Sequence, residues 1–129
     1  QDEVQRRILD EYAGEQPVGT CLLVPARRGG LLQYVAHTPT MRIPMDLEGT
    51  ENVYQAMRAM LIRVQKHNEV HHDIGTVSCC GLGALSGKLP LEKVAKQMAL
   101  AYAYFILPCP SKLSWDYAVE VSRQIESSK

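Results

Sequence analysis

The sequence lacks an excess of charge of either sign, because its 129 residues include 14 Lys and Arg against 14 Asp and Glu. A balanced chain has no net field to attract a polyanion, so general nucleic-acid binding is not expected. It also lacks an apolar run of the roughly 20 residues that span a bilayer, and a charged, then apolar leader. These absences predict no membrane association and an intracellular, cytoplasmic location, with the nucleus left open.

Cysteine is scarce and unpatterned. The four cysteines form no C-x-x-C pair and lack the dense spacing of a secreted disulfide scaffold. Cys79 and Cys80 are adjacent, so on a strand they point to opposite faces, which does not suit a metal or redox pair. We interpret all four, Cys21, Cys79, Cys80 and Cys109, as reduced, buried thiols. The adjacent His71 and His72 lack a third ligand at a recognisable spacing, so no metal site and no cofactor are predicted.

The chain does not begin with methionine: it opens at Gln1, and its first methionine is Met41. Val4, Ile8 and Tyr12 recur at the spacing of one apolar helix face, so residues 1–12 are predicted to be helical. A chain that opens inside a helix is expected to lack an upstream segment.

The following segments alternate between strand-like and helix-like patterns. Val18–Pro25 and Leu31–Ala36 are β-prone and are separated by Arg27-Arg28-Gly29-Gly30, which predicts a hairpin or two neighbouring strands. The loop His37–Gly49 is aperiodic. The later elements expected are a helix over Glu51–Asn68 capped by Thr50, a strand over Ile74–Cys80, a helix from Pro90 to Phe105, and a helix from near Ser114 that carries Trp115, Ala118, Val119, Ser122 and Ile125 on one face. This alternation predicts a single α/β domain over residues 1–129, with a sheet between helices.

The most informative stretch is the glycine-rich run Gly81-Leu82-Gly83-Ala84-Leu85-Ser86-Gly87, between a predicted strand and a predicted helix. Such a connection gathers backbone N–H groups and the positive end of a helix dipole, where phosphate binds well. The glycines allow close approach and positive φ, and Leu82, Ala84 and Leu85 offer apolar contacts for a sugar or base. The spacing alone is equally compatible with a turn that only closes a strand–helix connection. It fits neither the P-loop nor the Rossmann fingerprint.

The entry to the helix after this run also favours an anion. Leu89, just before Pro90, has no side-chain oxygen with which to cap the helix N–H groups. A bound phosphate would take that place.

Several stretches of the chain, taken together, resemble the macro domain family. The run Val77–Pro90, followed by Ala95, Gln97-Met98-Ala99 and Ala101-Tyr102, is similar to the second phosphate-binding loop and following helix of macro domains. Gly14–Thr20 resembles the family's helix-to-strand entry, and Tyr34–Met41 resembles its next strand and loop, followed by Asn52–Met57 on the helix. The resemblance covers nearly the whole chain in order.

This resemblance implies a three-layer α/β/α sandwich with a mixed sheet that binds ADP-ribose, a related nucleotide-diphosphate-sugar ligand or an ADP-ribosylated protein. Gly81–Gly87 would hold the diphosphate and distal ribose, and the rim Thr38, Pro39 and Thr40 joins the expected ligand-binding residues. The family's amino-terminal strands, with their first glycine-rich loop, have no counterpart before Gln1. The domain is therefore expected to be amino-terminally incomplete, and an unpaired sheet edge predicts a tendency to form a homodimer.

Two alternative functions stay open. The family's usual Gly-x-Gly-Thr-Gly reads Gly81-Leu82-Gly83-Ala84-Leu85 here, and Gly81–Leu89 contains no Asp, Glu or His to act as a general acid or base. No catalytic residue is identified, so an ADP-ribosyl hydrolase would need its catalytic group in missing amino-terminal sequence or in Thr38–Met41. The second alternative is a degenerate macro-like scaffold for protein interaction. His37 and Lys88 are interpreted as a structural histidine and a solvated surface cation.

Overall fold

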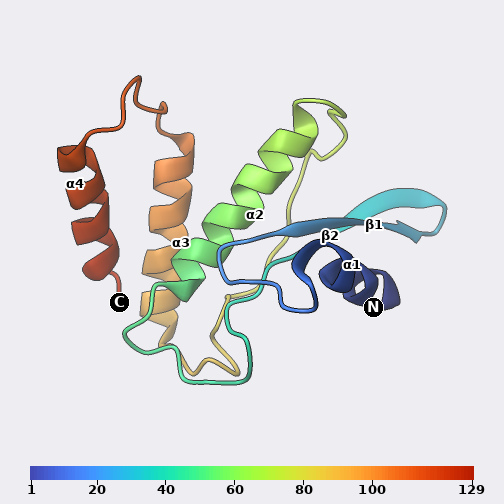
Figure 1. The fold of residues 1–129 in the computed structure, drawn as a ribbon, viewed down its shortest axis with the longest axis horizontal. Helices are drawn as coiled ribbons and strands as arrows, with labels where there is room; N and C mark the ends of the chain where they lie inside the picture. Colours follow the sequence, from blue (N-terminus) through green and yellow to red (C-terminus); the bar gives the residue numbers. More distant parts are fainter.

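The computed structural model describes the backbone of residues 1–129 and the side chains of all of them except Arg28. Its elements run α1 (Asp2–Tyr12), β1 (Leu22–Arg28), β2 (Leu31–His37), α2 (Asn52–Asn68), α3 (Leu91–Ile106) and α4 (Trp115–Glu126). The hairpin and α1 lie on one side of α2, and α3 and α4 lie on the other (Figure 1). Over the described backbone the chain is a mixed α/β protein with four helices and a two-stranded antiparallel sheet. Among the described residues, no helix combines the length and the apolar composition needed to cross a membrane.

The predicted hairpin is confirmed. β1 and β2 pair antiparallel, from Leu22 opposite His37 to Arg28 opposite Leu31. Gly29 and Gly30 connect the strands with φ of 58° and 82°. Positive φ at both central residues is typical of a two-residue type I′ hairpin turn, which explains why glycine occupies both positions.

The helix predicted at the start of the chain is also confirmed, and it is fastened to the hairpin. Arg7 of α1 donates a hydrogen bond over 2.7 Å to the carbonyl of Leu23 in β1 and pairs with Glu11 on its own helix. Ala13 adopts the left-handed conformation that ends α1. Arg7 therefore joins a helix to a strand by a charge-assisted hydrogen bond that bridges the two elements.

α2 is the central helix because both core clusters include residues from its first turn. One cluster consists of Leu47, Val53, Leu89 and Val94, and the other of Tyr54, Ala101 and Ile125. α3 packs along α2, and α4 packs on α3. Val53 and Met60 of α2 belong to the core, and they are 0% and 3% exposed.

The start of α2 is capped from α3. Gln97, a buried residue of α3, accepts a hydrogen bond from the N–H of Tyr54 at 3.0 Å and donates one to the carbonyl of Thr50 at 2.8 Å. The prediction that Thr50 caps this helix was wrong, because its hydroxyl donates instead to the carbonyl of Leu47. The Gln97 oxygen thus takes the N–H that a local N-cap side chain would take.

The strand predicted over Ile74–Cys80 was wrong. Ile74 is held by two hydrogen bonds with the Asn68 side chain, but the backbone of Gly75–Cys80 makes no hydrogen bond with any described residue, and all six residues are exposed. β-prone residues form a strand only when a neighbouring strand pairs with them. In consequence Cys79 and Cys80 are exposed rather than buried. Cys109, elsewhere in the chain, is also exposed, so the prediction of buried thiols was wrong for these three cysteines, while their free state agrees with it.

The three-layer sandwich with a mixed sheet stays a prediction of the family resemblance, as does pairing between two copies along open strand edges. The described sheet contains β1 and β2 alone.

The face predicted for α4 was only partly right. Ser114 is its N-cap and accepts a hydrogen bond from the N–H of Tyr117 at 3.1 Å, as expected. Ile125 is buried and Val121 packs beside it, whereas Trp115 is 82% exposed. Only the carboxy-terminal half of α4 reaches the second cluster, so apolar residues of its first turn remain at the surface.

Candidate functional site

The glycine-rich loop Gly81–Gly87 consists of two consecutive turns between the unpaired segment Ile74–Cys80, which we call the extended segment, and α3. The first turn is closed by the N–H of Ala84 on the carbonyl of Gly81, at 3.3 Å, and the second by the N–H of Lys88 on the carbonyl of Leu85, at 3.1 Å. Gly83, third in the first turn, has a φ of 76°. A type II turn requires positive φ at that position, so the sequence fits the turn.

The inner face of this loop is filled by Leu47. Leu47 is fully buried, and its N–H donates to the carbonyl of Gly87 over 2.9 Å. A Cβ at Gly83 would lie 2.8 Å from Cδ1 of Leu47 and 3.0 Å from Cγ2 of Val53, and a Cβ at Gly87 would lie 2.5 Å from the carbonyl oxygen of Gly83. At Gly81 the contacts would be ordinary. Packing against the core therefore requires glycine at two of the three positions, whatever ligand is bound.

The outer face of the loop offers unpaired hydrogen-bond donors. Leu85 and Ser86 are exposed, with Leu85 at 90%. Among the described residues, no hydrogen bond uses the backbone N–H groups of these two residues or of the half-buried Leu82 and Gly83. Backbone N–H groups are obligatory donors, so a cluster of unpaired ones is a good anion-binding surface.

The start of α3 adds to this surface. The helix begins at Leu91 with Pro90 as its N-cap, so the helix starts one residue after the predicted position, and no side chain caps it. An uncapped helix end carries unpaired N–H groups and the positive end of the helix dipole. The predicted lack of a capping side chain is confirmed.

The charges around the loop are few. Lys88 is exposed, makes no ion pair among the described side chains and has a φ of 52°, an unfavourable value for a residue with a Cβ. Lys93 pairs with Glu48, and Glu92 already lies in the first turn of α3. Lys88 is thus the unpaired cation that the loop itself contributes.

The rim Thr38–Thr40 is anchored by hydrogen bonds to the backbone. The Thr38 hydroxyl lies 3.0 Å from the carbonyl of Thr20 and 3.1 Å from that of Ala56, and its proton is shared between them. Asn52 donates to the carbonyl of Thr40 at 2.8 Å. The Thr38 side chain therefore has a structural role: it joins the segment that follows β2 to the segment that precedes β1 and to α2.

The rim and the loop are neighbours in space. Met41, Leu82 and Ala84 all pack against the first core cluster. Thr38 and Leu82 also line one cavity of about 620 Å³ between β2 and the extended segment. The assignment of Thr38, Pro39 and Thr40 and of Gly81 through Gly87 to ligand binding stays a prediction. Sequence reasoning missed Leu47, which stands in an aperiodic loop without a pattern to mark it.

His37 is held by Gln16. Its Nδ1 donates to Oε1 of Gln16 over 2.7 Å, while Nε2 of Gln16 donates to the His37 carbonyl at 3.2 Å, so the amide orientation sets the tautomer. Burial lowers the pKa of His37, which favours the neutral ring. This reciprocal pair agrees with the structural interpretation of His37.

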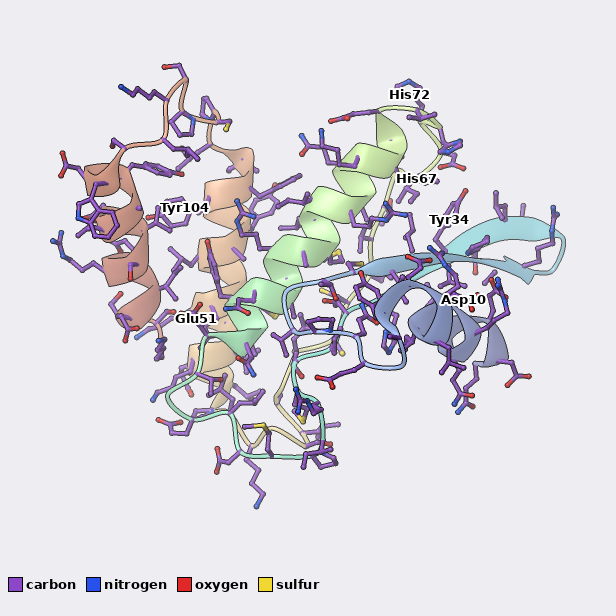
Figure 2. All side chains as sticks on the ribbon, in the orientation of Figure 1. Asp10, Tyr34, Glu51, His67, His72 and Tyr104 are labelled. Atoms are coloured by element: carbon purple, nitrogen blue, oxygen red, sulfur yellow. The ribbon has the colours of Figure 1, made fainter. Side chains whose placement is uncertain are left out.

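A polar cluster joins β2 to the end of α2. Tyr34 donates to Asp73 over 2.7 Å, and Nε2 of His67 lies 2.7 Å from the other oxygen of the same carboxyl group. Figure 2 shows Tyr34 on the hairpin and His67 at the end of α2. His71 stacks on His67 with ring centroids 4.5 Å apart. Among the described residues, no three His, Cys, Asp or Glu side chains are grouped so that they could hold a metal ion.

Replacing Tyr34 by phenylalanine is expected to raise the pKa of Asp73. The hydrogen bond from Tyr34 is the main cause that lowers this pKa, followed by that from His67. A carboxyl group with a lowered pKa stabilises the fold above its unfolded pKa, and this contribution is lost as pH falls through the folded value. Titration of the Asp73 carboxyl carbon by NMR measures the change.

The matched control is Tyr102→Phe, which removes a phenol from an exposed position on α3. It should leave the titration of Asp73 unaltered. An unchanged Asp73 titration in Tyr34→Phe would show that this hydrogen bond does not form in solution.

The observed geometry defines a class: an α/β domain in which a glycine-rich loop with unpaired N–H groups leads into an uncapped helix. A family model described as Macro domain matches residues 2–98, which is most of the chain. The chain belongs to the Macro domain family, as its resemblance predicted, and members of this family typically bind ADP-ribose. No curated protein and no solved structure matches the chain significantly.

Proposed function

We propose that this domain binds ADP-ribose or a related nucleotide-diphosphate-sugar ligand, with its diphosphate on the outer face of the Gly81–Gly87 loop. The observation that carries the proposal is the set of unpaired N–H groups in that loop, at the entry to the uncapped helix α3. Such an arrangement binds phosphate by several hydrogen bonds and by the helix dipole together.

The chemistry of this site is binding rather than catalysis. The loop contributes backbone donors, the Ser86 hydroxyl and the cation Lys88, and no group that titrates near neutral pH to act as a general acid or base. Membership of an ADP-ribose-binding family supports the same ligand class. The partner that presents such a ligand would be either the free nucleotide or an ADP-ribosylated protein.

The experiment is a calorimetric titration with ADP-ribose of the wild type and of Ser86→Pro. Ser86 is the second residue of the Leu85–Lys88 turn, where proline is favoured, so the change removes one N–H and keeps the turn. Loss of one hydrogen bond to a charged group is expected to weaken binding roughly 10- to 100-fold. Substitution at Gly83 is a poorer test because a Cβ there disturbs the core.

The control variant is Ser86→Ala, which removes the hydroxyl and keeps the N–H; its affinity should stay close to that of the wild type. ADP and ribose phosphate, titrated in parallel, separate the contributions of the diphosphate and the ribose. Equal affinity in wild type and Ser86→Pro would remove the loop from the binding site. No binding by the folded wild type would favour a scaffold, and release of ADP-ribose from a modified protein would favour a hydrolase.

A further inference from the structure

A second concave surface lies between α2, α1 and the entry to β1, and it shares no lining residue with the cavity that Thr38 and Leu82 line. We call it the basic cavity: about 590 Å³, lined among others by Arg58, Arg63, Lys66 and Tyr54 of α2, by Tyr12 of α1 and by Gly19–Cys21. Its volume falls in the range of small-molecule pockets. None of the residues that line it is acidic.

Arg58 and Arg63 differ from other arginines of this protein in being unpaired. Arg6 and Arg42, for example, form ion pairs with neighbouring carboxylates, whereas neither Arg58 nor Arg63 forms one among the described side chains. Lys66 pairs with Glu69, but both side chains are exposed, and such pairs exchange readily for a better anion. Arg58 and Arg63 lack a carboxylate partner on their own helix because α2 (Asn52–Asn68) contains no Asp or Glu.

The other polar groups of the basic cavity do not offset this charge. Burial raises the pKa of the Cys21 thiol to about 11, with Arg63 acting weakly in the opposite direction. Burial also raises the pKa of Tyr54, which lies beside Arg58. Both groups are neutral at pH 7, so the cavity is purely cationic although the whole chain has no net charge. A concave surface of one sign concentrates counter-ions more strongly than a flat one.

The arrangement of the cations indicates the kind of anion. At a rise of about 1.5 Å per residue, Arg58 and Arg63 lie about 7.5 Å apart along α2, and Lys66 lies about 4.5 Å further on. One phosphate can occupy a single guanidinium fork, whereas a chain of phosphates is long enough to meet all three cations at once. We propose that the basic cavity is a second anion site, separate from the glycine-rich loop, that binds a linear oligophosphate.

The test is a titration of isotope-labelled protein with inorganic tripolyphosphate, observed by NMR at low salt, where charge interactions are least screened. Saturable shifts are expected at the amides of residues 54–66 and at the side-chain Nε of Arg58 and Arg63. Arg58→Gln/Arg63→Gln should bind at least tenfold more weakly. Arg58→Lys/Arg63→Lys keeps the charge and should retain part of the affinity.

The matched control is Lys96→Gln/Lys112→Gln, which removes the same charge from two exposed positions outside the basic cavity. It should change the affinity less than twofold, and in Ser86→Pro the shifts of residues 54–66 should follow the wild-type titration. Adenosine triphosphate, titrated in parallel, tells a nucleotide-borne chain from a free one, since a nucleoside that contacts Tyr12 would tighten binding.

Three outcomes would overturn the inference: equal losses in the glutamine variant and its control, shifts confined to Gly81–Gly87, or no saturation. The ADP-ribose titration tests the glycine-rich loop and the tripolyphosphate titration tests the basic cavity. The two surfaces differ, so a failure of one proposal does not decide the other. Thermal unfolding of each variant confirms that it is folded, as expected for exposed positions.

Discussion

Replacing Gln97 by leucine is expected to lower the free energy of unfolding by about 2–4 kcal/mol, because two polar groups lose their partner in the interior. Gln97 is fully buried, accepts from the N–H of Tyr54 and donates to the carbonyl of Thr50. Leucine has a similar volume and makes neither hydrogen bond. Urea unfolding at several wavelengths, with the midpoint and slope compared to the wild type, measures the loss.

The control for this change is Gln124→Leu on the exposed surface of α4, where the side-chain amide donates a hydrogen bond to Glu120 on the same helix and to no other described residue. Its effect should stay within about 0.5 kcal/mol. If Gln97→Leu and Gln124→Leu had the same free energy of unfolding, the hydrogen bonds from Gln97 to the start of α2 would not contribute to stability. Amide hydrogen exchange in the first turn of α2 gives a second measurement, since this turn should exchange faster in Gln97→Leu.

Gly83→Ala is the second substitution with a large expected effect, about 2–5 kcal/mol. A Cβ there would lie 2.8 Å from Leu47 and 3.0 Å from Val53, and the backbone has a φ of 76°. Overpacking a core costs about 1–3 kcal/mol and a left-handed conformation about 1–2 kcal/mol for a residue other than glycine. Thermal and urea unfolding both report the sum.

Gly49→Ala separates these two causes. Gly49 has a φ of 73°, close to that of Gly83, but a Cβ there would meet nothing within 4 Å. It carries the conformational cost alone, about 1–2 kcal/mol, so the difference between the variants is the packing of Leu47 and Val53 against the loop. Similar losses in both would mean that Leu47 moves aside without cost.

These two predictions show which properties of the glycine-rich run Gly81–Gly87 could be predicted from the sequence and which could not. The sequence predicted the position of the run before a helix and the lack of a capping oxygen at Leu89; in the structure Pro90 is the N-cap, and no described side chain caps the helix. The sequence did not show why positions 83 and 87 require glycine. The reason is their close contact with Leu47, which is distant in the chain and is brought to the loop by the fold. The same glycines therefore serve the core and leave the N–H groups of the outer face unpaired.

The helices and the hairpin followed from local chemistry. Periodic apolar residues, the Gly29-Gly30 connection and the Ser114 cap each act over a few neighbouring residues, so one sequence suffices to predict them.

Only the tertiary structure decided which of these elements meet. The segment Ile74–Cys80 has strand-forming residues but no partner beside it in the described structure, so composition alone gave the wrong element. The cap of α2 comes from Gln97 on another helix, and the inner face of the glycine loop is filled by Leu47. Pairing, capping between helices and packing depend on groups distant in the chain, and a local pattern carries no information about them.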